Sequence, residues 1–211
     1  MSQFRGVILE GYSNAGKTSV LKTLKQMQAN DDDGERSVII LGEHYSQILH
    51  EVNGQHLYLN KKEHLELLRD RVHMLKQLFD WQEKLGSSSR SKGIFFILER
   101  FHLNHRVAFL NEAAQELDEL ENELFRMGAT CALLTISNDV VETRLQSRNP
   151  TDWLNKSPED RKQACQSLLL QQEEYRKQAK NSIIPTIEIN TDKRDWKSYA
   201  EQIYKLKSVF V

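Results

Sequence analysis

Short apolar segments recur along the chain, and most of them are continuous rather than alternating with polar residues. Continuous apolar runs of about four to eight residues are typical of strands that are buried on both faces. Such strands form parallel sheets that helices cover on either side. The pattern predicts five of these strands, at Phe4–Leu9, Ser37–Leu41, Ile94–Leu98, Thr130–Ile136 and Ile183–Ile189.

Longer segments between these strands have the spacing of amphipathic helices, with apolar residues every three or four positions. One of them starts with the features of a helix N-terminus: Ser157 as the N-cap, then a proline and two acids in the first turn. Strands that alternate with helices predict a three-layer α/β domain. The expected helices cover Leu65–Leu85, Leu110–Leu124, Ser157 to about Ala179, and Asp195 to about Leu206.

The composition fits one globular domain over residues 1–211. The 29 basic and 30 acidic residues give a net charge of −1, which excludes a strong overall attraction to nucleic acid. No apolar segment approaches the roughly 20 residues of a membrane helix, and the first residues lack the features of a secretory or transit signal. Because two cysteines cannot form a disulfide framework, we expect a cytoplasmic protein. From the balanced charge and the short apolar segments we expect no nucleic-acid or membrane partner.

The strongest chemical signal is a phosphate-binding loop directly after the first predicted strand. The segment from Gly11 to Thr18 fits the pattern G-x-x-x-x-G-K-[ST] at every fixed position. Its glycines let backbone N–H groups turn toward phosphate oxygens, and the following helix N-terminus favours the same anion. In this motif Lys17 reaches the β- and γ-phosphates, and the Thr18 hydroxyl ligates Mg²⁺. The predicted nucleotide-binding residues are Gly11, Tyr12, Ser13, Asn14, Ala15, Gly16, Lys17, Thr18 and Ser19.

A GTPase would carry two further motifs, which the sequence does not supply in the right context. The segment Asp31–Gly34 has the spacing of Asp-x-x-Gly but precedes a strand instead of following one. The segment Asn190–Lys193 follows the last predicted strand but has the wrong residue order for a guanine reader.

Three sequence features resemble those of the thymidylate kinase and deoxynucleoside kinase group of P-loop kinases. They occur in the same order as in that group, over nearly the whole chain. Glu10 precedes the phosphate loop, Glu99-Arg100 ends the third strand, and the segment 137–148 carries two arginines four residues apart. The resemblance implies a five-stranded parallel sheet flanked by helices, with a lid at about residues 144–161. It also implies an ATP- and Mg²⁺-dependent transfer of a phosphoryl group.

Each of these residues also has a physical interpretation of its own. A carboxylate such as Glu99, at the carboxyl edge of a sheet, can hold Mg²⁺, and Arg100 can stabilise charge on a moving phosphoryl group. Arg144 and Arg148 share a helix face, so both guanidinium groups can reach one anion. The alternatives are a salt-bridged strand end for the first pair and a solvated helix face for the second.

Glu43 is the candidate general base. It follows the second predicted strand, at a position similar to the glutamate that takes the acceptor's proton in deoxynucleoside kinases. Those kinases usually have proline next, whereas this chain has His44, which could itself assist because imidazole titrates near neutral pH. The alternative is that Glu43 is an acid that caps a helix or lies at the surface.

The acceptor site departs furthest from the group. Asn104 stands where thymidylate kinases carry a hydroxyl residue, and their Tyr-Gln pair is missing. We therefore expect poor use of thymidine monophosphate. Arg71 matches a substrate-binding arginine of the group only roughly and could pair with Glu63 or Asp70 instead.

The sequence thus predicts a nucleoside or nucleotide kinase that transfers the γ-phosphoryl group of ATP to a small acceptor. Two other functions remain open: a P-loop kinase for another small hydroxyl compound, and a P-loop protein that binds nucleotide as a switch. The sequence decides neither the acceptor nor the oligomeric state, and a homodimer is among the open states.

Overall fold

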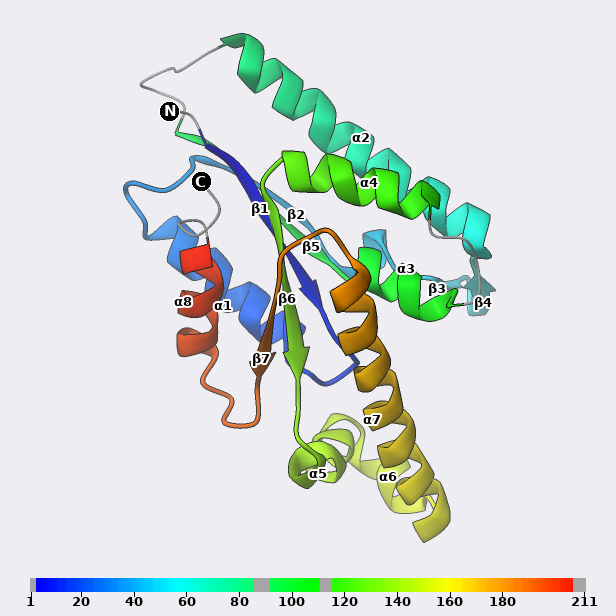
Figure 1. Cartoon of the computed structure of the whole chain (residues 1–211). Coiled ribbons are helices and arrows are strands. Elements are labelled where there is room, and N and C mark those ends of the chain that lie inside the picture. The colour runs from blue at the N-terminus through cyan, green and yellow to red at the C-terminus, as the bar shows by residue number, and fades with distance from the viewer. Residues whose placement is uncertain (1–2, 86–91, 111–114, 207–211) are drawn as a thin grey trace.

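Five parallel strands form the central sheet, in the order β2-β5-β1-β6-β7. The computed structural model describes residues 3–85, 92–110 and 115–206 (Figure 1). The register aligns the carboxyl ends of the middle strands, so that Leu9 pairs with Glu99 and Leu41 with Leu98. The strands are β1 (Gln3–Glu10), β2 (Ser37–Leu41), β5 (Gly93–Glu99), β6 (Ala129–Thr135) and β7 (Thr186–Asn190).

Helices cover both faces of this sheet, as the alternating pattern predicts. On one face α1 and α8 pack together, and α2, α3, α4 and α7 lie on the other (Figure 1). The remaining two helices, α5 and α6, lie beyond the carboxyl edge of the sheet beside the first half of α7. The bounds are α1 (Lys17–Ala29), α2 (Lys61–Leu85), α3 (His102–Ala108), α4 (Gln115–Arg126), α5 (Asn138–Arg148), α6 (Pro150–Asn155), α7 (Pro158–Asn181) and α8 (Trp196–Lys205).

Two hydrophobic clusters, one on each face, explain why the strands are continuously apolar. Successive residues of a strand point to opposite faces. Val7 therefore joins the cluster under α1 and α8, while Ile8 joins the cluster under α2 and α4. Phe95 and Phe96 divide in the same way. Each such side chain is fully buried and stabilises the fold by roughly 1.5–3 kcal/mol.

The predicted elements are confirmed, with two corrections at their ends. The last strand begins at Thr186 and not at Ile183, because α7 continues to Asn181 and Pro185 has no N–H for a ladder. The helix expected from Leu110 is α4, which begins at Gln115; residues 111–114 lie outside the described part. The predicted N-cap Ser157 accepts the backbone N–H of Asp160, and Asp195, which caps the last helix, accepts that of Ser198.

A two-stranded hairpin is an element that the hydrophobic pattern does not predict. It consists of β3 (Leu49–Val52) and β4 (Gln55–Tyr58), and it forms a separate antiparallel sheet. The 3₁₀ turn η1 (Glu43–Tyr45) precedes it, directly after β2. All four residues of β4 are exposed, so the hairpin stands clear of the main core.

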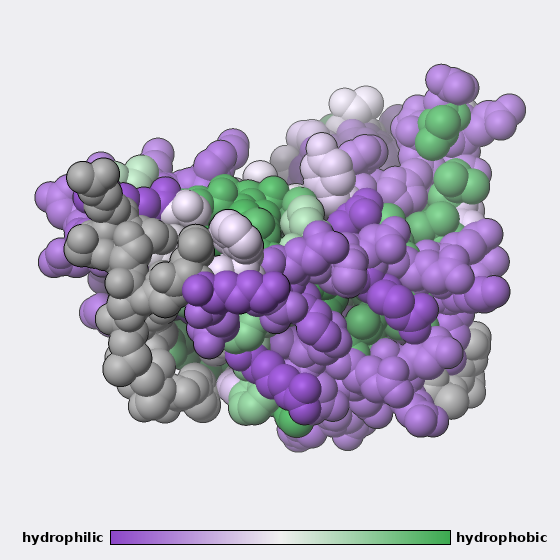
Figure 2. Space-filling model, turned by 90° about the horizontal axis from the view of Figure 1, so that it is seen from above, coloured by the Kyte–Doolittle hydropathy of each residue, from purple (hydrophilic) through white to green (hydrophobic). Residues whose placement is uncertain are grey.

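Figure 2 shows one face of the molecule, coloured by hydropathy. Seen from the side of α2 and α4, it is mostly hydrophilic, and its hydrophobic residues form separate small patches (Figure 2). Within the described ranges, no helix is both long enough and apolar enough to cross a bilayer.

Candidate functional site

The predicted phosphate loop joins β1 to α1 at the carboxyl edge of the sheet. Gly11 and Gly16 have φ angles of 129° and 95°, which favour glycine. A Cβ at Gly11 would collide with the carbonyl oxygen of Leu134, and one at Gly16 would lie 2.5 Å from the Trp196 ring. The two glycines of the motif therefore allow a backbone path that other residues would block.

Lys17 folds back over this loop. Its Nζ donates to the carbonyl oxygens of Gly11 at 2.9 Å and Tyr12 at 3.2 Å. Burial, with Arg100 nearby, lowers the pKa of Lys17 to about 8. A bound polyanion would supply the negative charge that this buried ammonium group lacks.

A cleft of about 520 Å³ opens in front of the loop. Its walls are strongly cationic, because four arginines join Lys17 there. Among the described residues that line the cleft, Glu43 is the one carboxylate. This charge distribution suits a polyphosphate. The lining residues are Ser13, Asn14, Gly16, Lys17, Thr18, Ser19, Glu43, Arg100, Arg144, Ser147, Arg148, Arg194 and Trp196.

The structure brings Glu43 and Arg100 together from neighbouring strands. Arg100 directly follows β5 and has a φ of 53°. Its Nε lies 3.1 Å from Glu43 Oε1, and its Nη2 donates to Ser13 Oγ at 2.7 Å. Arg100 therefore links the candidate base to the phosphate loop.

Glu99 is buried beside this pair and could contribute to a metal site. Its Oε2 accepts the backbone N–H of Glu43 at 3.3 Å, whereas its Oε1 is buried with no hydrogen-bond partner in the described part of the chain. Thr18 lines the cleft, whereas Glu99 is not among the lining residues and lies behind Glu43. One carboxylate and one hydroxyl, completed by phosphate oxygens and water, are donors that suit Mg²⁺.

The two arginines of α5 both line the cleft, but their surroundings differ. Arg144 is buried, donates from Nη2 to the Thr191 carbonyl oxygen, and lies 5.6 Å from the Trp196 ring centroid. Arg148 is exposed, and its Nη1 is 3.4 Å from Asn14 Oδ1. Arg144 thus belongs to the wall of the cleft, while Arg148 can turn toward a ligand.

The other predicted residues of the phosphate loop divide into those that line the cleft and those that pack beneath it. Ala15 is buried and its carbonyl oxygen accepts from Thr191 Oγ1 at 2.9 Å. Tyr12 packs against a small hydrophobic cluster under α5 and α7. Neither Gly11 nor these two residues line the cleft, whereas Ser13, Asn14 and Ser19 do.

Three cleft residues, Ser147, Arg194 and Trp196, are missing from the sequence-based set. Arg194 and Trp196 lie just past the loop 190–193, which is attached to the site by Thr191 and by Asp192, whose carboxylate accepts from the Ser137 backbone N–H at 2.9 Å. The local signal was the adjacent basic pair Lys193-Arg194 ahead of the N-cap Asp195. Its function becomes visible only when the last loop meets the phosphate loop.

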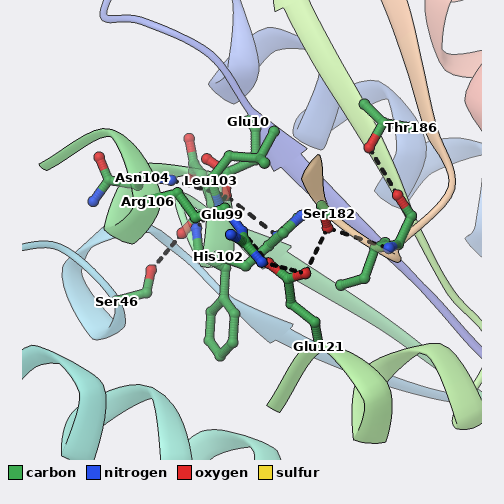
Figure 3. A network of polar contacts seen from close by, with 12 residues as sticks. Glu10, Ser46, Glu99, His102, Leu103, Asn104, Arg106, Glu121, Ser182 and Thr186 are labelled. Carbon is green, nitrogen blue, oxygen red and sulfur yellow. Dashed lines mark hydrogen bonds and ion pairs between the residues drawn. The ribbon is translucent and has the colours of Figure 1, made fainter. Parts of the chain in front are cut away.

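Glu10, on which part of the resemblance rests, faces the interior and not the cleft. Its Oε1 accepts backbone N–H groups of Phe101 at 2.8 Å and Leu103 at 2.9 Å, and so caps the start of α3 (Figure 3). Complete burial raises the pKa of Glu10 to about 7. His102 Nδ1 lies 3.6 Å away.

Two acceptor-side candidates have protein partners. Asn104 Oδ1 accepts from the Tyr175 hydroxyl at 3.1 Å, and Arg71 Nε donates to the Tyr45 carbonyl oxygen at 3.4 Å. Arg71 does not line the cleft.

The segment predicted as a lid contains a helix. α5 ends at Arg148 as expected, but α6 follows at once, with Asn149 as its N-cap and Pro150 in its first turn. Trp153 is buried, and Arg161 donates to its carbonyl oxygen at 3.1 Å. The tryptophan thus packs the segment down.

Comparison with known proteins shows similarity at the level of the fold. Neither a protein-family model nor a curated protein matches the sequence. The YorR protein from Bacillus subtilis, crystallised in complex with phosphorylated GDP, is similar over 95% of this chain and 94% of its own, with a TM-score of 0.58 and 15% identity. The protein APE1195 is similar over 98% and 96%, with a TM-score of 0.51 and 12% identity. The five-stranded α/β fold is therefore shared with these proteins.

Proposed function

We propose that this protein is an ATP- and Mg²⁺-dependent phosphotransferase of the nucleoside or nucleotide kinase type, within the thymidylate kinase and deoxynucleoside kinase group. The observation that carries the proposal is the convergence of the phosphate loop, Arg100 and Glu43 on one cationic cleft. Phosphoryl transfer requires mainly positioning and charge stabilisation. The cleft offers both.

The phosphate chain of ATP would lie along the loop. Backbone N–H groups and the N-terminus of α1 bind its oxygens, and Lys17 moves from the Gly11 and Tyr12 carbonyls to the β- and γ-phosphates. Arg100 and Arg148 stabilise charge on the transferring group, while Arg144 shapes the wall. An arginine in such a position contributes about 10³–10⁵ to the rate in related chemistry.

The residues present fit a magnesium ion. Thr18 Oγ1 and Glu99 Oε1 would hold it, and the unpartnered Oε1 is the observation that favours this role. When bound, Mg²⁺ neutralises phosphate charge. Within the described residues, no group of three or more His, Cys, Asp or Glu side chains is arranged to hold a metal. Magnesium sites that rely on substrate phosphates need no such group.

Glu43 is the group that removes the acceptor's proton. Its ion pair with Arg100 fixes the carboxylate at the edge of the cleft, where an acceptor hydroxyl would approach the phosphate chain. The hydroxyl proton passes to the carboxylate as the oxygen attacks phosphorus. The segment 144–161 forms a lid that carries both α5 arginines over the bound nucleotide.

The similarity to YorR supports a nucleotide as ligand, because that protein was crystallised with phosphorylated GDP. We place the activity in the cytoplasm, since both cysteines, Cys131 and Cys165, are unpaired.

The decisive experiment is a screen with nucleosides, nucleotides and other small alcohols as acceptors, which measures ADP release from ATP and GDP release from GTP. A kinase gives ADP at least tenfold faster with its acceptor, together with an equal amount of phosphorylated acceptor. Slow hydrolysis that no acceptor stimulates would instead indicate a nucleotide switch. A phosphorylated product from a non-nucleoside alcohol would identify the other kinase class.

A further inference from the structure

Two buried histidines outside the cleft form a direct contact between α2 and α3. His64 lies in the first turn of α2 and His105 in α3, and their Nδ1 atoms are 2.8 Å apart. The rings are nearly parallel, with an interplanar angle of 15° and centroids 5.0 Å apart. Both side chains are almost fully excluded from solvent. We call these two residues the histidine pair.

The hydrogen-bond network determines which nitrogens carry protons. His64 Nε2 is 2.9 Å from the Ser46 carbonyl oxygen, and a carbonyl can only accept, so Nε2 carries a hydrogen. Neutral His64 then has a lone pair on Nδ1, and His105 must donate to it from its own Nδ1. If His64 gained a second proton, two N–H groups would face each other. His105 would then have to give up its Nδ1 proton, so the contact in this form belongs to two neutral rings, and it is lost once both rings are protonated.

The chain of bonds continues from the histidine pair to the candidate active site. Ser46 is buried directly after η1, and its backbone N–H donates to the Glu43 carbonyl oxygen at 3.1 Å. Its hydroxyl donates to the Glu99 carbonyl oxygen (Figure 3). Ser46 thus ties the turn that bears Glu43 to the end of β5, and His64 holds Ser46 from the other side.

We propose that the histidine pair is a positioning device, which holds the Glu43 turn against the end of β5 through the hydrogen bond between its two Nδ1 atoms and the contact of His64 with Ser46. The proposal deepens and rests on the function proposed above, since Glu43 is the group positioned. His64 and His105 are positioning residues, because their contacts reach the cleft only through Ser46.

The surroundings of the histidine pair favour the neutral state. The charged groups that act on it from the described elements packed around it are the cations Lys61 of α2 and Arg106 of α3, and the imidazole of His50 in β3 also faces His64. Arg106 is in turn paired with Glu121 and Asp118 of α4. The Phe109 ring, 4.9 Å from the nearer imidazole centroid, covers the pair with apolar surface.

Burial lowers the pKa of both imidazoles, that of His105 to about 3. The contact therefore persists at neutral pH and is lost only when both rings are protonated.

The test compares His64→Leu and His64→Gln with the same changes at His73, an exposed histidine on α2. Leucine fills the space but leaves the Ser46 carbonyl and the His105 N–H unpaired. Glutamine can still donate and accept but does not titrate. In His64→Leu we expect the amides of Tyr45 and Ser46 to exchange hydrogen at least tenfold faster than in the wild type. We expect His64→Gln to restore most of their protection and both His73 variants to match the wild type.

Activity provides the second readout. At pH 7.5 His64→Leu should lower kcat at least tenfold, with the dissociation constant for ATP within about twofold of the wild-type value. His64→Gln should recover most of this kcat, because glutamine can still donate to the Ser46 carbonyl and accept from His105. A kcat of His64→Leu within about twofold of the wild-type value would overturn the proposal.

A third readout needs no variant and no activity. In ¹⁵N spectra at pH 7.5, His64 should show a protonated Nε2 and His105 a protonated Nδ1, with a scalar coupling across the Nδ1–Nδ1 bond. Absence of a scalar coupling between the two Nδ1 atoms would overturn the proposal, as would unchanged amide exchange in His64→Leu. If the wild type shows no acceptor-dependent ADP release, the proposed function fails, while exchange and ¹⁵N spectra still decide on the histidine pair.

Discussion

Arg100 Nε lies 3.1 Å from Glu43 Oε1, and the same guanidinium group donates to Ser13 in the phosphate loop. Arg100 has a φ of 53°, a conformation that costs a non-glycine residue about 1–3 kcal/mol. Strain of this kind persists where the surrounding structure over-determines it, often at functional sites. Here it turns Arg100 out of the end of β5 toward both partners.

The first prediction concerns Glu43. Glu43→Gln keeps the shape of the side chain and an acceptor for Arg100 but removes the basicity. With a hydroxyl acceptor we expect kcat to fall by about 10²–10⁴, or about 3–5 kcal/mol of barrier. The affinity for ATP should stay within about twofold, since Glu43 is not assigned to the phosphates. The measurement is kcat for the best acceptor beside an ATP dissociation constant.

The matched control is Glu51→Gln, which removes an exposed carboxylate from β3. It should leave kcat unchanged. A loss of less than about fivefold in Glu43→Gln would place the base elsewhere, with His44 as the next candidate. An acceptor that already carries a phosphate has an anionic oxygen and needs no base, so the same variant helps to distinguish nucleoside from nucleotide substrates.

Lys17→Ala should abolish phosphoryl transfer and leave the fold intact. The side chain is buried against the phosphate loop, and its Nζ is positioned to move onto the phosphates. Lys25→Ala, an exposed lysine on the same helix, is the control and should behave as the wild type. The rate of acceptor-dependent ADP release measures turnover in both variants, and circular dichroism measures whether they are folded. Wild-type turnover by a folded Lys17→Ala protein would refute the assignment of the cleft.

Gly16→Ala tests the packing of the last loop on the phosphate loop. The added Cβ would lie 2.5 Å from the Trp196 ring at a φ of 95°. We expect a loss of about 1–3 kcal/mol from overpacking on top of about 1–2 kcal/mol from the positive φ. Gly54→Ala is the control, because its φ is 76° but no atom lies within 4 Å of the added Cβ. Urea unfolding should show the larger loss of unfolding free energy in Gly16→Ala. Equal losses in the two variants would mean that the Trp196 ring moves aside at no cost.

The proposed lid makes a prediction about hydrogen exchange. Residues 144–161 should gain protection when a non-hydrolysable ATP analogue and Mg²⁺ bind, because Arg144 and Arg148 line the cleft. The central turns of α2, which lie on the far face of the sheet, provide the internal control and should not change. Identical hydrogen exchange of residues 144–161 with and without nucleotide would mean that the segment does not close as a lid. The two arginines would then form a fixed or solvated helix face.

The sheet and the phosphate loop were predictable because both leave local signals in the sequence. Ile8 packs on one face of the sheet and Val7 on the other, so the strand is apolar without interruption. The phosphate loop is specified by its own eight residues. The positions of Glu43 and Glu99 followed from the rule that carboxyl ends of parallel strands meet at one edge.

The hairpin and α6 had local signals of another kind. Asn53 and Gly54, with φ angles of 53° and 76°, form the two-residue turn that this dipeptide favours. The flanking strands are exposed and mixed in polarity, so the hydrophobic pattern alone did not reveal them. Asn149-Pro150 ends one helix, and the same two residues also begin the next one.

Trp196 and the histidine pair had no usable local signal. Trp196 meets Gly16 only in the folded chain. His64 meets His105 from another helix. An isolated histidine or tryptophan on a helix face does not indicate such a partner.

The last prediction concerns Glu10 and the pH dependence of stability. Burial raises the pKa of Glu10 from an ordinary 4.5 to about 7, so the folded protein holds this proton more tightly than the unfolded chain. The resulting stabilisation is complete below about pH 4.5 and is lost as the pH rises to about 7. Glu10→Gln can still accept the N–H groups of Phe101 and Leu103 but cannot ionise. Relative to the wild type, the variant should therefore gain about 2–3 kcal/mol in unfolding free energy between pH 5 and pH 8.

Urea unfolding at pH 5 and pH 8 measures this difference, with the exposed Glu119→Gln of α4 as control. His102 acts in the opposite direction, because burial lowers its pKa to about 4 and its contribution is lost as the pH falls from about 6.5. It is present in both proteins, so the difference between them isolates Glu10. A constant difference at the two pH values would show that Glu10 is already ionised in the fold, and that the backbone N–H groups at the start of α3 outweigh its burial.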